Sequence, residues 1–142
     1  MSKRFLFHIL LITCLLTACV DEEQNALPYV RVDFSVSISM YPDLTGGLPI
    51  KVQEGYDGYS RNGILIVPKA FGNDGYEAFD ATCTRNIKEE TRSLRLNKGD
   101  YTATCPKCGT VYNLFTGYAQ NQSFHLQRYR AYGSNGRIYV TN

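Results

Sequence analysis

The sequence has no tryptophan, only two histidines and no large excess of charge of either sign. His8 lies in an N-terminal segment that we expect to be removed, so His125 would be the one histidine left. A site with two histidine ligands from one chain is therefore excluded. Removal of the same segment takes Lys3 and Arg4 and leaves 13 Lys and Arg against 13 Asp and Glu. A neutral chain gives no electrostatic reason to expect a nucleic-acid partner.

Recognisable catalytic patterns are also lacking. No Ser-His-Asp constellation, no pair of carboxylates suited to glycoside hydrolysis and no phosphate-binding glycine loop can be found. The sequence therefore does not define an enzyme, although a role in electron transfer stays open.

The N-terminus has the pattern of a targeting segment. A positively charged start precedes the apolar residues 5–16, a run too short for an ordinary membrane-spanning helix. The run leads into Leu-Thr-Ala-Cys, which resembles the lipobox of bacterial lipoproteins and ends at Cys19. We expect residues 1–18 to be a removed signal peptide, residues 19–28 a lipidated cysteine and tether, and residues 29–142 the folded domain. An ordinary secretory signal is the alternative.

An acidic run follows the expected lipidation site. Asp21, Glu22 and Glu23 resemble the signal that sends some Gram-negative lipoproteins to the cell surface, but a solvated linker is an equal explanation. We expect the protein in the bacterial cell envelope, held in the outer membrane by acyl chains on Cys19. Its partners would be the lipid bilayer and a redox or envelope protein.

The remaining residues predict one β-rich domain. Eleven Tyr, seven Phe and twelve Gly favour strands and turns. Residues 29–38 alternate apolar and polar side chains, which indicates a half-buried antiparallel strand. Residues 87–96 fit either one helical turn or an exposed strand. Further strands are predicted over residues 48–52, 63–67, 76–80, 101–104 and 109–115, and a hairpin turns at residues 133–136.

Two short loops carry the cysteines of the expected domain. The first reads Cys83-Thr84-Arg85, and the second reads Cys105-Pro106-Lys107-Cys108-Gly109. Once Cys19 is lipidated, three thiols remain, which is an odd number in a location that permits disulfides. In a monomer at least one thiol is then unpaired, unless it binds a metal or another chain.

These loops, with the aromatic-rich strand after the second one, resemble the cluster-binding loops of Rieske iron–sulfur domains. The resemblance implies an all-β fold, a small antiparallel β-sandwich with both cysteine loops at one end. In a Rieske centre two cysteines hold one iron and two histidines hold the other. Cys83 and Cys105 match the cysteine ligands, whereas Arg85 and Cys108 occupy the histidine positions.

Three converging thiolates would suit soft metals such as zinc, copper(I) or iron in a cluster. A fourth ligand is missing from the motif, and His125, Asp80, Arg85 or a partner chain are the candidates. Arg85 is a poor ligand because its guanidinium stays protonated.

We favour a domain that has lost the cluster, in which two of Cys83, Cys105 and Cys108 form a disulfide and the function is binding or assembly. Such a disulfide would contribute roughly 2–4 kcal/mol. The main alternative is a [2Fe–2S] electron-transfer protein with non-standard ligation, whose potential would lie below that of a Rieske centre. A zinc site or a redox-active thiol pair also remain.

Overall fold

The computed structural model describes residues 26–53, 58–69, 75–85, 87, 91–97, 99–120 and 124–142. The expected signal peptide, Cys19 and the acidic run lie outside this part. Within it, no helix is both long and apolar enough to span a bilayer.

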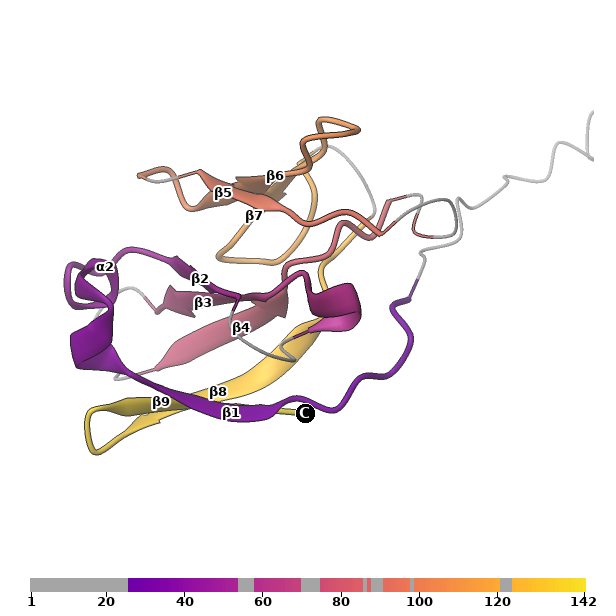
Figure 1. The fold of residues 1–142 in the computed structure, drawn as a ribbon. Helices are drawn as coiled ribbons and strands as arrows, with labels where there is room; N and C mark the ends of the chain where they lie inside the picture. Colours follow the sequence, from indigo (N-terminus) through magenta and orange to yellow (C-terminus); the bar gives the residue numbers. More distant parts are fainter. Residues whose placement is uncertain are drawn as a thin grey trace, which may run out of the picture.

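Nine strands and three short helical turns make up the described chain (Figure 1). The strands are β1 Asp33–Ser37, β2 Ile50–Val52, β3 Ile64–Pro68, β4 Tyr76–Asp80, β5 Arg95–Asn97, β6 Thr102–Thr104, β7 Val111–Asn113, β8 Arg128–Ser134 and β9 Arg137–Thr141. The helical turns are η1 Ile38–Met40, α2 Pro42–Thr45 and η2 Tyr59–Arg61. The strands form a six-stranded sheet in the order β1-β9-β8-β4-β3-β2 and a three-stranded sheet in the order β5-β6-β7, with every pairing antiparallel.

The first strand is shorter than its alternating sequence predicts. Ser37 is paired with Arg137, the first residue of β9, and the Ile38 amide donates to the carbonyl of Gly136. Beyond this point the partner strand has turned away, so Ile38 begins a helical turn instead of extending β1. The alternation is therefore a correct signal for a strand, but the length of its partner sets where the strand ends.

Strand β3 is apolar because both of its faces are covered. Leu65 and Val67 pack in the core beneath the three-stranded sheet, whereas Ile64 and Ile66 pack in a second core formed as the six-stranded sheet curls. Side chains alternate between the two faces of a strand, so a strand between two cores has no position for a polar residue. Figure 1 shows the small sheet lying over β2, β3 and β4, with β1, β8 and β9 on the other side.

The C-terminal hairpin is tighter than the predicted four-residue turn. Only Asn135 and Gly136 connect β8 to β9, with φ of 49° and 71°. A turn with two left-handed residues matches the twist of the strands, and Asn-Gly is the sequence that favours it.

The segment that precedes β6 resolves into strand-like structure where it is described. Ser93 forms a β-bridge with Thr82, and Leu94 is buried in the core below the small sheet. The Leu94 amide donates to the carbonyl of Ala81, and the Cys83 amide donates to that of Arg92. This segment therefore joins the first cysteine loop to the small sheet.

Candidate metal centre

The first cysteine loop is held in place by a buried carboxylate at the end of β4. One oxygen of Asp80 accepts from the Thr82 amide at 2.9 Å, and the other accepts from the Tyr59 amide at 2.7 Å and the Tyr129 hydroxyl at 2.8 Å. Burial raises the pKa of Asp80, and these hydrogen bonds partly offset that rise. The carboxylate thus connects the loop to η2 and to β8.

The second cysteine loop is a tight turn between β6 and β7. The Cys105 amide donates to the carbonyl of Thr110, and the Gly109 amide donates to the carbonyl of Cys105, each at 2.9 Å. Gly109 has φ of 71°, a left-handed conformation that favours glycine. The turn brings Cys108 back towards Cys105.

The two loops place three thiols together. The Sγ atoms of Cys83, Cys105 and Cys108 all lie within 4.8 Å of one another, and those of Cys83 and Cys108 are 3.7 Å apart. All three are unpaired thiols. Cys83 and Cys105 are fully buried, and Cys108 is half-buried, so the group opens to solvent on the side of Cys108.

The hydroxyl of Tyr112, which is fully buried on β7, reaches across to the first loop. It lies 3.4 Å from Cys83 Sγ, accepts from the Thr84 amide at 3.2 Å and lies 3.2 Å from Thr84 Oγ1. Nothing in the linear pattern of the sequence shows which tyrosine hydroxyl will lie against a sulfur.

The thiols differ in acidity because their surroundings differ. Burial raises the pKa of Cys83 to about 12. Burial also acts to raise the pKa of Cys108, but hydrogen bonds from the Thr110 side chain and amide and from the other two thiols outweigh it and lower the pKa to about 7. Cys108 is therefore more easily converted to a thiolate than Cys83.

Arg85 is connected to the thiol group through the hydroxyl of Thr110. Its Nη1 donates to Thr110 Oγ1 at 3.5 Å, and Thr110 Oγ1 lies 3.2 Å from Cys108 Sγ. The arginine is half-buried, and its charge is linked to Cys108 Sγ through the Thr110 hydroxyl.

Two expected candidates for the fourth ligand lie elsewhere in the described part of the chain. The group of converging ligand atoms contains neither Asp80 nor His125. Asp80 uses both carboxylate oxygens in the hydrogen bonds above. His125 Nδ1 lies 3.2 Å from the carbonyl oxygen of Leu126, and its ring meets Tyr118 edge-on at 5.5 Å.

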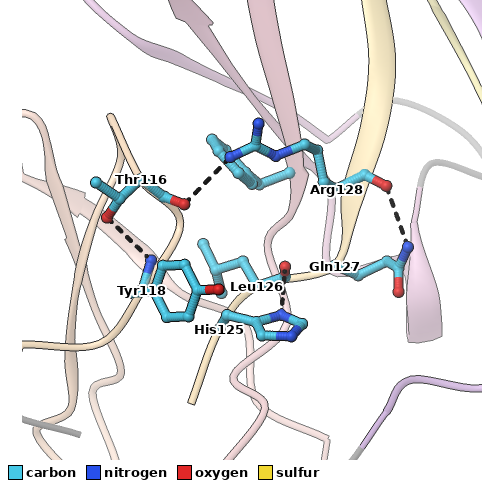
Figure 2. A pocket seen from close by; sticks show the side chains of 7 residues that line it. Thr116, Tyr118, His125, Leu126, Gln127 and Arg128 are labelled. Atoms are coloured by element: carbon cyan, nitrogen blue, oxygen red, sulfur yellow. Dashed lines mark hydrogen bonds between the residues drawn. The ribbon is translucent and has the colours of Figure 1, made fainter. Parts of the chain in front are cut away.

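His125 instead lines a shallow cavity of about 320 Å³ (Figure 2). Its other lining residues are Phe79, Thr116, Tyr118, Leu126, Gln127 and Arg128. The Arg128 guanidinium lies over the Phe79 ring, donates to the carbonyl of Thr116 and pairs with Glu77 at 3.2 Å. Glu77 also pairs with Lys69 at 3.1 Å, so one carboxylate is shared by two cations beside the cavity.

Comparison with known proteins identifies the fold. No protein-family model and no curated protein matches the sequence. The plasma membrane Rieske protein PetC3 from the cyanobacterium Synechocystis PCC 6803 superposes with a TM-score of 0.51 and 20% identity, over 80% of this chain and 100% of that one. The ferredoxin of carbazole 1,9a-dioxygenase from Nocardioides aromaticivorans IC177 gives 0.50 and 12%, over 80% and 98%. The chain has a Rieske-type fold, and the predicted all-β architecture is confirmed.

The side chains at the site do not fit a Rieske [2Fe–2S] cluster. In a Rieske centre the residues at the positions of Cys83 and Cys108 bind different irons, so the width of the cluster separates their ligand atoms. Here their sulfurs are 3.7 Å apart, close enough to bind one ion. At the remaining position Arg85 presents a cation that already donates to Thr110.

Proposed function

We propose that this chain is a membrane-anchored Rieske-fold protein that binds a soft metal through Cys83, Cys105 and Cys108. The observation that carries the proposal is the convergence of the three Sγ atoms within 4.8 Å at one end of the domain. Thiolates select zinc, copper(I) and iron over the harder cations. A metal would use all three sulfurs, whereas a disulfide would leave one unpaired.

A disulfide-stapled domain without a metal is the second candidate. Cys83 Sγ and Cys108 Sγ are 3.7 Å apart, so a small movement would bring them to the S–S bond length of about 2.05 Å. The proposed envelope location permits this oxidation. Such a domain would serve in binding or assembly with a redox or envelope protein partner.

Electron transfer through a [2Fe–2S] cluster has the support of the fold alone. Both solved structures are described as a Rieske protein or a ferredoxin, but at 20% and 12% identity the likeness extends to architecture and not to ligands. The short Cys83–Cys108 distance and the lack of a fourth converging ligand among the described residues weigh against it.

The proposed anchor is lipid on Cys19, and the proposed location of the domain is the outer membrane. The lipobox-like sequence supports a membrane anchor, and the Synechocystis neighbour is described as a plasma membrane protein. Metabolic labelling with an alkynyl fatty acid tests the anchor, because label should enter the wild-type chain and not the Cys19→Ala variant. Unlabelled wild-type chain would show that the segment is an ordinary secretory signal.

The metal is tested on the full chain, extracted in detergent under anaerobic conditions, by elemental analysis and an acid-labile sulfide assay. We expect about one equivalent of a soft metal per chain, which Cys108→Ser should lose and Lys107→Ala, in the same turn, should keep. Cys108 is the best position to vary because it is the least buried of the three thiols. A metal-free chain with two thiols blocked to alkylation would instead establish the disulfide-stapled domain.

A further inference from the structure

Among the described residues, only three ligand atoms converge at the site, one fewer than a tetrahedral ion takes. The geometry points to a single tetrahedral ion whose fourth coordination position is open and takes a small anion from solution, with Arg85 positioning that anion. This inference rests on the proposed metal site and gives it a ligand-binding role.

The distances favour one ion. Zinc binds thiolate sulfur at about 2.3 Å, and two such sulfurs on a tetrahedral ion are then about 3.8 Å apart. The sulfurs of Cys83 and Cys108 are 3.7 Å apart, and Cys105 completes a triangle with no side longer than 4.8 Å. A modest contraction around one ion would satisfy all three.

The fourth position has no protein ligand in the described part of the chain. No other Cys, His, Asp or Glu joins the three thiols there. A structural zinc site normally closes with four protein ligands, whereas a site that binds exogenous molecules keeps one position open. The exposed edge of the group, marked by half-buried Cys108 and Arg85, is where that position would face solvent.

The charge near this edge favours an anion. Three thiolates and a divalent ion carry a net charge of −1, which by itself repels an anion from solution. The Arg85 guanidinium is linked to the Cys108 sulfur through the hydroxyl of Thr110, at 3.5 Å and 3.2 Å. The Arg85 charge offsets the net charge of −1, so an added anion can replace solvent on the ion.

Cobalt(II) is the probe, because its visible absorption bands depend on the geometry and donor set of the ion. The full chain in detergent is reduced, stripped with a chelator and loaded with cobalt. We expect one cobalt per chain with tetrahedral bands, and azide should shift these bands with saturation. N-methylimidazole, a neutral donor, should also shift them.

Arg85→Gln should weaken azide binding about fivefold, which is the scale of one solvent-exposed charge interaction. The affinity for N-methylimidazole should stay unchanged. Arg85→Lys should restore most of the azide affinity. Arg130→Gln is the matched control, since Arg130 is an exposed cation on β8 and its loss should not alter azide binding. Equal azide affinity in Arg85→Gln and the wild type would overturn the role of Arg85.

Other results would contradict the open fourth coordination position without contradicting metal binding. Bands that do not respond to either probe would show a closed site. A change in the bands of Glu89→Gln or Glu90→Gln before any probe is added would show a carboxylate ligand, from residues outside the described part. Two irons with two sulfides per purified chain would replace the single ion by a cluster. Failure to bind any metal would instead remove the proposed function itself.

Discussion

Removal of the Tyr112 hydroxyl is expected to weaken both the fold and the metal centre. Tyr112→Phe keeps the buried ring and deletes one oxygen, so it leaves only a very small cavity. That oxygen is the acceptor for the Thr84 amide at 3.2 Å and lies 3.4 Å from Cys83 Sγ. Because Thr84 is buried, its amide would lose its acceptor without gaining water.

The size of the effect follows from that unpaired amide. A buried donor left without a partner costs about 1–3 kcal/mol, and the loss of a group that supports a metal ligand typically costs about 10- to 100-fold in metal affinity. Burial raises the pKa of Tyr112, so the hydroxyl keeps its proton at neutral pH and can donate to the Cys83 thiolate. The metal-bound chain should therefore lose more stability than the metal-free chain.

Urea unfolding of the two forms, combined with competition for zinc against a chromogenic chelator, measures both effects. Tyr132→Phe is the matched control, because Tyr132 is an exposed β8 residue stacked on Tyr139 and the same change there should stay within about 0.5 kcal/mol. If Tyr112→Phe matched this control in both assays, the hydroxyl would have no part in holding the first loop.

Three further changes test other contacts. Asp80→Asn should destabilise the fold by about 1–3 kcal/mol, because an amide cannot accept from all three donors. A free energy of unfolding equal to that of the wild type would contradict this. Since burial raises the pKa of Asp80, the folded chain keeps a proton that the unfolded chain loses above pH 3.8. The contribution of Asp80 to the unfolding free energy should therefore fall as pH rises through the folded pKa, and Asp80→Asn should lack this pH dependence. Gly117→Ala should cost about 1–3 kcal/mol in thermal or urea unfolding, since Gly117 has φ of 80° and a Cβ there would lie 2.7 Å from the Phe79 ring; an unchanged midpoint would show that the ring can move. In the metal-free chain, iodoacetamide should modify Cys108 before Cys83, with a rate that rises around pH 7; mass spectrometry that finds Cys83 modified first would refute the order of acidities.

The local elements of the fold could be predicted from sequence because their signals are local. Strand β4 begins and ends where predicted, and the apolar run of β3 ends at Pro68 as expected. The Asn135-Gly136 turn also follows from residue type. The pairing of β1 with β9 joins residues about 100 positions apart, and no short pattern encodes it.

The site was harder to predict than the fold. The spacing of Cys105 and Cys108 identified a tight turn, and the structure places Cys83 beside it. The roles of Tyr112 and of the buried Asp80 depend on contacts between strands that are distant in sequence. Pattern reasoning therefore finds candidate ligands but misses the residues that orient them.

The three thiols come from two different sheets, so an ion bound by all three would link these sheets. Cys83 follows β4 of the large sheet, whereas Cys105 and Cys108 lie between β6 and β7 of the small sheet. An ion held by all three would clamp the two sheets, and free metal at 100 times its dissociation constant would add about 2.7 kcal/mol against their separation. Metal scarcity would then loosen the small sheet, so the concentration of an ion would set the rigidity of one end of the molecule.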